Sequence, residues 1–105
     1  MTSKQRAYLK GLAMNLTPAM QIGKGSLTPE VTESVSELFN KRELVKISIL
    51  QNCLDDPKQI AQLLAERTGS QVVQVIGKKI VLYKEGKKEN KKIILPDAPR
   101  KKSYD

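Results

Sequence analysis

The sequence predicts one α/β (α+β) domain with the element order α-β-α-β-α-β-β and a four-stranded mixed sheet. Stretches with apolar residues at helical spacing alternate with short runs of β-branched residues, a pattern typical of parallel strands joined by crossover helices. The last two strand-like runs are separated only by Gly77-Lys78, which predicts an antiparallel hairpin. With 105 residues, the chain is long enough for one small core.

The first helix is expected to begin at Ser3, whose hydroxyl can cap its N-terminus. It is expected to end near Leu16, because Pro18 disfavours a helical residue before it. The apolar side chains recur at i, i+3, i+4 and i+7 and predict one buried stripe, made of Leu9, Leu12, Ala13 and Leu16. A short strand over residues 19–23 follows.

The second helix is expected to have Thr28 as its cap and Pro29 at its first position. Its buried stripe consists of Val31, Val35, Leu38 and Phe39. Residues 43–50 form the clearest half-buried strand, in which polar residues alternate with Val45, Ile47 and Ile49. Lys46 is therefore expected on the opposite side of the sheet from these apolar residues.

The third helix is marked by Asp56 as its cap, paired with Gln59, and by Gly69 as its stop. Its residues expected to face the core are Ile60, Leu63 and Leu64. Two strands over residues 71–76 and 79–84 come next. The two-residue connection between them begins with glycine, which predicts a tight turn of type II′.

After Gly86 the alternating pattern gives way to Lys-rich sequence with Pro96 and Pro99. Residues 1–86 are therefore assigned to the folded domain, and residues 87–105 to a basic, flexible tail. The apolar triplet Ile93-Ile94-Leu95 within the tail is suited to docking on the domain.

The charge of the chain points to an anionic partner. It has 19 Lys and Arg residues against 11 Asp and Glu, a net charge of +8 and a pI near 9.7, as expected for a protein that binds RNA, DNA or an acidic membrane surface. No apolar run approaches the ~20 residues of a membrane span, and Lys10 interrupts the apolar segment that a signal peptide would need. The acid-free start resembles a transit peptide but is better explained as the first helix, so a cytoplasmic location is expected. We also expect the protein to be a monomer.

Catalysis is disfavoured by composition. The chain contains no histidine, and Cys53 is its single cysteine, better explained as a small apolar side chain near a strand end. We expect no metal, no cofactor and no enzymatic activity. The acids available for acid–base chemistry are better explained by capping and turn roles: Glu43, Asp55 and Asp56. Tyr83 is the only aromatic residue placed for base stacking, so recognition of the RNA backbone fits better.

The stretch Gly23-Lys24-Gly25-Ser26, between a short strand and a helix start, predicts a phosphate-binding loop. Glycines let the backbone approach a ligand, lysine supplies a cation, and the helix N-terminus adds unpaired N–H groups and a positive partial charge. Further candidates for RNA contact are four cations on other elements: Arg6, Lys10, Lys46 and Lys78.

Four fragments in the same order resemble the YhbY family of bacterial stand-alone CRM domain proteins, a domain named for chloroplast RNA splicing and ribosome maturation. The resemblance covers residues 3 to 84. The fragments are Leu9-Lys10-Gly11-Leu12-Ala13, Ile22-Gly23-Lys24-Gly25 with Leu27-Thr28, Glu43-Leu44-Val45-Lys46, and Val75-Ile76-Gly77-Lys78 followed by Val81-Leu82-Tyr83.

The resemblance implies a fold similar to the C-terminal domain of translation initiation factor three. It also implies binding to RNA through a Gly-x-x-Gly loop, likened to the backbone-clamping loop of KH domains. On this chain the loop falls at residues 23–26, with Ser26 in place of the second glycine. We expect Gly25 to supply the backbone freedom and the Ser26 hydroxyl to donate to a phosphate.

Bacterial members of the family are associated with precursors of the large ribosomal subunit. The expected role is therefore a non-catalytic factor that binds ribosomal RNA during assembly or maturation of that subunit. An alternative role is a general RNA chaperone or a regulator acting on mRNA or tRNA. A different class, also open, is a membrane-surface or protein adaptor that uses the basic face.

Overall fold

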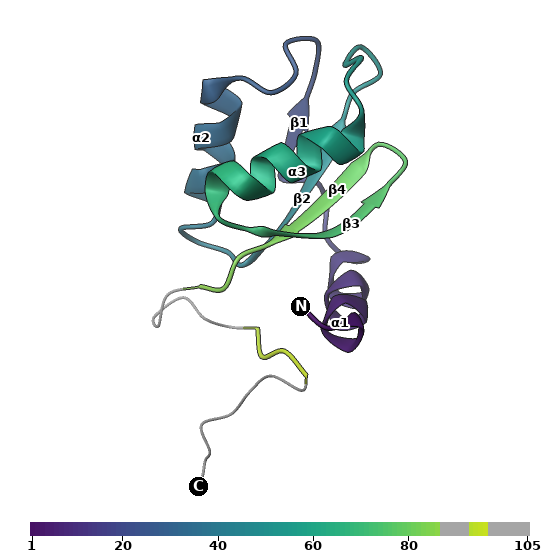
Figure 1. Cartoon of the computed structure of the whole chain (residues 1–105), viewed down its shortest axis with the longest axis vertical. Coiled ribbons are helices and arrows are strands. Elements are labelled where there is room, and N and C mark those ends of the chain that lie inside the picture. Colours follow the sequence, from purple (N-terminus) through teal and green to yellow (C-terminus); the bar gives the residue numbers. More distant parts are fainter. Residues whose placement is uncertain (87–92, 97–105) are drawn as a thin grey trace, which may run out of the picture.

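The computed structural model describes residues 1–86 and 93–96 and confirms the expected fold class (Figure 1). The helices and strands follow the predicted order, and most bounds differ from the prediction by no more than one residue. They are α1 (Ser3–Ala13), β1 (Met20–Ile22), α2 (Pro29–Leu38), β2 (Leu44–Ile49), α3 (Pro57–Thr68), β3 (Gln71–Ile76) and β4 (Lys79–Tyr83).

The four strands form one mixed sheet in the order β1-β2-β4-β3. β1 is parallel to β2, whereas β4 is antiparallel to both β2 and β3. It follows that β1, β2 and β3 all run in the same direction, and their C-terminal ends lie at the same end of the sheet. β1 and β3 are the two edge strands.

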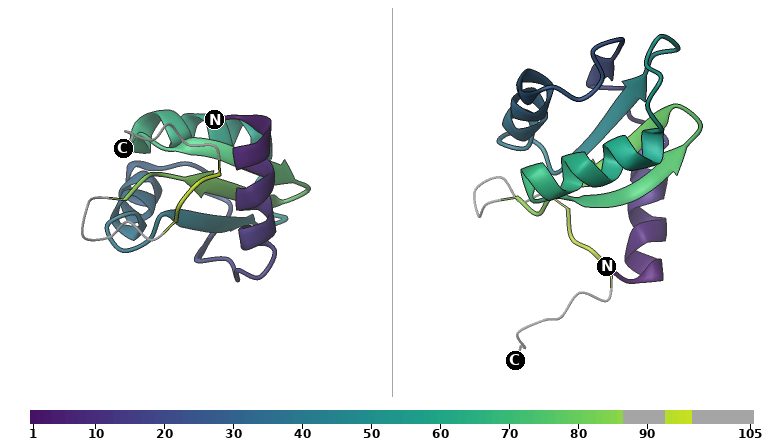
Figure 2. Two further views of the ribbon diagram at one scale, coloured as in Figure 1. Left: turned by 90° about the horizontal axis from the view of Figure 1, so that it is seen from below. Right: turned by 45° about the horizontal axis from the view of Figure 1, so that its top comes forward.

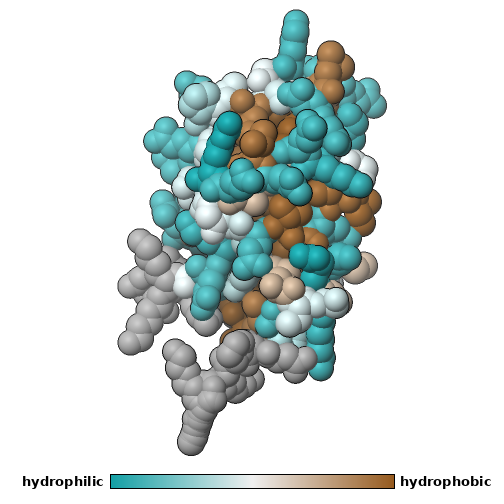
Figure 3. Space-filling view, in the orientation of Figure 1, coloured by the Kyte–Doolittle hydropathy of each residue, from teal (hydrophilic) through white to brown (hydrophobic). Residues whose placement is uncertain are grey.

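The helices lie on both faces of the sheet (Figure 2). α2 and α3 pack on one face, where the larger core is formed by alternate strand residues such as Val45, Ile47 and Ile80. α1 packs on the other face, over a smaller core that includes Leu44, Val81 and Tyr83. The outer surface of the α2 and α3 side is mostly hydrophilic, with separate apolar patches (Figure 3).

The ends of α1 differ from the prediction. Its cap is Thr2, which forms a capping box with Gln5: each backbone N–H donates to the other residue's side chain at 3.0 Å. The helix ends at Ala13 rather than near Leu16. Beyond Ala13 the chain turns, with Leu16 N donating to Ala13 O at 3.0 Å, and the Lys46 ammonium group stabilises this turn by donating to the carbonyl oxygens of Ala13 and Leu16, each at 3.2 Å.

The predicted caps of the other two helices are confirmed. Thr28 Oγ1 accepts from Val31 N at 3.1 Å, and Asp56 Oδ1 accepts from Lys58 N at 3.2 Å. The expected pairing of the Asp56 cap with Gln59 is wrong, because the carboxylate accepts from Lys58 N instead. Gly69 ends α3 with a left-handed φ of 71°. The β3–β4 turn also agrees with the type II′ prediction, because Gly77 has a positive φ of 55° and Lys78 does not.

Two apolar positions were wrongly assigned to the core. Leu63 of α3 is 41% exposed and Leu12 of α1 is 38% exposed. In α3 the residue buried in its place is Ala61, which belongs to the larger core together with Ile60 and Leu64. The prediction for Cys53 is confirmed, since this side chain is buried in the larger core.

A buried carboxylate joins the domain to the start of the tail. Glu43 is 4% exposed and accepts from Gly86 N at 2.8 Å and from Ile93 N at 2.7 Å. Ile93 and Leu95 pack against the smaller core, as expected for the apolar triplet, while Ile94 is exposed. The rest of the predicted basic tail, residues 87–92 and 97–105, lies outside the described residues.

Tyr83 gives a stability prediction for alkaline pH. Burial, followed by the charges of Glu43 and Glu85, raises the pKa of Tyr83 from 10.0 to about 12. The unfolded chain therefore ionises first, and the native state loses on the order of 2 kcal/mol of stability as pH rises from 10 to 12. Urea unfolding of wild type and Tyr83→Phe across this range measures the effect. The variant should lose less stability, and parallel losses in the two proteins would contradict the assignment.

Candidate nucleic-acid interface

The predicted phosphate loop lies at the end of the sheet where the three parallel strands finish (Figure 1). Gly23 follows β1 and packs against the β2–α3 connection: a Cβ here would lie 3.4 Å from both Asn52 Oδ1 and Leu50 Cδ1. The hairpin adjoins the same end, because Ile49 N donates to Lys78 O at 2.7 Å. The structure therefore brings the loop and Lys78 to one end of the sheet.

Residues 23–26 form a tight turn closed by a hydrogen bond from Ser26 N to Gly23 O, 2.9 Å long. Within the described chain, the backbone N–H groups of Lys24 and Gly25 donate to no carbonyl group. Two adjacent N–H groups at the tip of a turn are suited to an oxyanion. The backbone of this turn thus offers donors at the position where the sequence predicted a phosphate.

The expected division of roles within the turn is wrong at two residues. Ser26, not Gly25, takes the left-handed conformation, with φ of 54°. The Ser26 hydroxyl is buried and has no hydrogen-bond partner among the described residues, so it does not face a ligand. Ser26 therefore occupies the conformation that a second glycine would adopt most easily, and it shapes the turn rather than offering its side chain.

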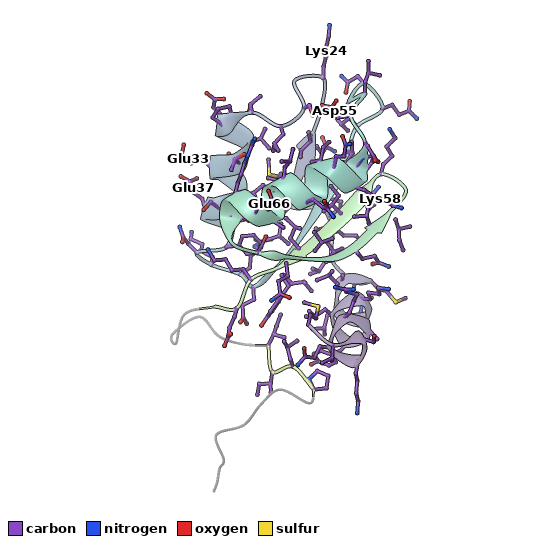
Figure 4. The ribbon with its side chains drawn as sticks, in the orientation of Figure 1. Lys24, Glu33, Glu37, Asp55, Lys58 and Glu66 are labelled. Carbon is purple, nitrogen blue, oxygen red and sulfur yellow. The ribbon has the colours of Figure 1, made fainter. Side chains whose placement is uncertain are left out.

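The Lys24 side chain, at the tip of this turn, is accessible to a ligand. Its side chain is exposed and extends away from the body of the protein (Figure 4). No hydrogen bond or ion pair to any other described residue holds its ammonium group. A cation in this state can neutralise a phosphate without first breaking an internal interaction.

The remaining predicted cations are in three different places. Arg6 and Lys10 lie on α1, away from the loop, and line a hollow of about 520 Å³ beside β3. Lys46 lies on the α1 side of the sheet, as predicted, but its ammonium group donates to the carbonyl oxygens of Ala13, at the end of α1, and of Leu16. Lys78 is exposed in the hairpin. Only Lys78 shares the end of the sheet with the loop.

Acidic side chains mark the surfaces that disfavour a polyanion. α2 carries three exposed acids, Glu30, Glu33 and Glu37. Glu33 and Glu37 lie on the outer side of the helix (Figure 4). Asp55 and Asp56 lie in the β2–α3 connection, beside the loop. The field of these carboxylates opposes a polyanion along α2 and along this connection.

Two polar residues of α3 were not assigned from the sequence. Lys58 and Gln62 line the same hollow as Arg6 and Lys10. The available signal was their spacing of four residues on an exposed helix face, which gives two neighbouring hydrogen-bond donors. Tyr83, by contrast, is 3% exposed and cannot stack on a base.

Within the described ranges 1–86 and 93–96, no helix has the length and apolar character needed to cross a bilayer. The same ranges contain no grouping of His, Cys, Asp and Glu suited to a metal ion. Fold and site together define a small basic α+β domain that presents a cationic, glycine-containing turn at the end of a mixed sheet.

Comparison with known proteins places this domain in a family. Residues 1–84 match the CRS1 / YhbY (CRM) domain, and the chain belongs to this family. It is 46% identical over 96 residues to the "Probable RNA-binding protein YqeI" of Bacillus subtilis (strain 168), covering 91% of this chain and 99% of the relative. It is 32% identical to an "RNA-binding protein" of Haemophilus influenzae, covering 91% and 95% of the two chains.

The fold also matches a solved structure. The solution structure of SAV1595 from Staphylococcus aureus superimposes with a TM-score of 0.78 at 46% sequence identity. The match covers 91% of this chain and 99% of the other. The resemblance to the CRM family and the mixed α+β fold are thereby confirmed.

Proposed function

We propose that this protein is a non-catalytic, monomeric RNA-binding protein of the cytoplasm that contacts the RNA backbone through the Gly23–Ser26 turn. The observation that carries the proposal is the unengaged Lys24 at the tip of a turn whose N–H groups are also available. Relatives of this chain are named as RNA-binding proteins, and none of those described above has an enzymatic name. The net charge of +8 supports a polyanionic ligand.

The mechanism is electrostatic and geometric. The N–H groups of Lys24 and Gly25 donate to one phosphate oxygen or to two neighbouring ones, and the Lys24 ammonium group neutralises the charge. Ser26 keeps the turn in shape, and the sheet below holds it in place. Contacts of this kind position a strand without reading its sequence, so specificity has to come from the fold of the RNA.

We further propose that the ligand is ribosomal RNA in precursors of the large subunit, and that the protein acts in assembly or maturation. The support is the family to which the chain belongs, whose bacterial members are associated with such precursors. Crosslinking in cells, followed by sequencing of the attached RNA, tests the proposal. We expect most crosslinks in large-subunit RNA, with the protein co-sedimenting with precursor particles until RNase is added.

Crosslinks concentrated in mRNA or tRNA would contradict the ribosomal role and favour the chaperone or regulator. Co-sedimentation that survives RNase but not lipid extraction would contradict RNA binding altogether. The control is Lys24→Glu expressed at the same level, which should reduce crosslinks while the protein stays folded.

A further inference from the structure

α1 covers only part of its face of the sheet. A row of four residues crosses all strands on this face, since Gln21 pairs with Ser48, Ser48 with Lys79, and Lys79 with Ile76. Their neighbours along the strands, such as Ile22, point into the larger core on the other side. Gln21, Lys79 and Ile76 are exposed, and Ile76 has 60% of its surface accessible. The row is therefore an open strip of sheet that begins two residues before Gly23.

This strip leads to two hollows that meet at the edge strand β3. The first, about 300 Å³, lies on the sheet face between α1 and the hairpin and includes Lys46 and Lys79. The second, about 520 Å³, lies between α1 and α3 and includes Arg6, Lys10 and Lys58. Gln74 and Ile76 line both, so the two hollows adjoin at the edge of the sheet.

The charge of this region is of one sign. Among the residues that the structure describes, no carboxylate lines either hollow, whereas Glu37 lines the hollow beside α2 and Glu43 the one near Leu16. Two amide side chains, Gln62 and Gln74, line the hollows beside the cations. We name the region the β3 surface and define it by Arg6, Lys10, Lys58, Gln62, Gln74 and Lys79.

We propose that the β3 surface is a second RNA site, which takes the nucleotides that flank the segment gripped by the Gly23–Ser26 turn. The inference rests on the proposed function, because it assumes that the turn holds an RNA strand. Glu30, Glu33 and Glu37 repel that strand along α2, and Asp55 and Asp56 repel it along the β2–α3 connection. The open strip from Gln21 to Lys79 carries no acid and leads to β3.

The chemistry of the β3 surface fits single-stranded RNA. The Arg6 guanidinium can hold a phosphate with two parallel hydrogen bonds, and Lys10 and Lys58 each supply a further cation. The amides of Gln62 and Gln74 have both donors and acceptors, as the edges of unpaired bases require. An acidic peptide added to the free edge of β3 is the competing occupant. RNA is favoured because the surface is continuous with the turn.

The test compares two triple variants with equal loss of charge. R6A/K10A/K58A removes three cations of the β3 surface, and K41A/R42A/R67A removes three exposed cations elsewhere. Each is titrated against an unpaired RNA of about 16 nucleotides and one of about four, the length that a KH-type loop clamps. Thermal unfolding verifies that both variants fold.

We expect the β3-surface variant to bind the long RNA on the order of 10- to 100-fold more weakly at 0.15 M salt, with a salt slope lower by about 2, because about 0.7 counterions are released per phosphate. Its affinity for the short RNA should match wild type. The control variant should change either affinity by less than about threefold, since screening weakens charges more than ~8 Å from the ligand.

Equal loss in both triple variants, or equal loss for both RNA lengths, would overturn the second site. Binding of poly-glutamate that depends on the β3 surface, with unchanged affinity for the long RNA, would overturn it in favour of a peptide. Lys24→Glu separates the two proposals. If it weakens binding of both RNAs while the β3-surface variant weakens neither, only the second site is wrong; if neither variant weakens binding, the proposed function is wrong as well.

Discussion

Lys24→Glu is expected to weaken RNA binding by roughly 10- to 100-fold at physiological salt, the largest effect of any single surface substitution. The change removes one phosphate contact and places a carboxylate against the backbone at the tip of the turn. Because Lys24 is exposed and no described residue pairs with it, stability should change by less than about 0.5 kcal/mol. Fluorescence anisotropy against unpaired RNA, together with thermal unfolding, measures both quantities.

The matched control for this variant is Lys41→Glu, the same charge reversal at an exposed cation after α2. It changes the net charge by an equal amount but lies away from the turn. It should lower affinity only slightly through the long-range field, and less at higher salt. Comparable losses in the two variants would show that RNA responds to net charge alone and would remove the turn from the mechanism.

The fold was predictable because local signals agreed with one another. The alternation of Val45, Ile47 and Ile49 defined both the strand and its buried face, and the caps at Thr28 and Asp56 fixed where two helices begin. The errors arose where contacts between residues distant in sequence determine the local structure. α1 ends at Ala13, and Lys46, 33 residues later in the chain, stabilises this end by binding the carbonyl oxygen of Ala13. The spacing of apolar residues along the helix cannot predict that interaction.

The candidate site was predictable only in part, for a related reason. The turn is local in sequence, so its glycines and Lys24 could be recognised as a candidate phosphate loop. Whether Arg6 and Lys10 adjoin it depends on how α1 packs against the sheet, and the structure places them beside β3 with Lys58 instead. The conformation of Ser26 was also beyond the sequence, since most residues other than glycine avoid positive φ.

Glu43 gives the largest expected effect on stability, because its carboxylate is buried and satisfies two backbone N–H groups that are distant in sequence. Glu43→Ala should destabilise the protein by about 3 kcal/mol, since each hydrogen bond to a charged group contributes roughly 1.5 kcal/mol or more. Glu43→Gln keeps one carbonyl acceptor but sets an amide N–H against the other N–H, so its loss should be intermediate. Urea unfolding measures the free energy of unfolding of wild type, Glu43→Gln and Glu43→Ala, which should decrease in that order.

Hydrogen exchange separates this specific role from a general loss of stability. In Glu43→Ala the amides of Gly86 and Ile93 should exchange faster than global unfolding allows, because both have lost their acceptor. The amide of Lys84 is an internal control, since it donates to the backbone oxygen of Glu43 at 2.9 Å, which the substitution leaves in place. The pKa of Tyr83 should fall in the same variant, because the Glu43 charge is one cause of its rise. Unchanged exchange at Gly86 and Ile93 would mean that apolar packing of Ile93 and Leu95, not the carboxylate, holds this segment on the domain.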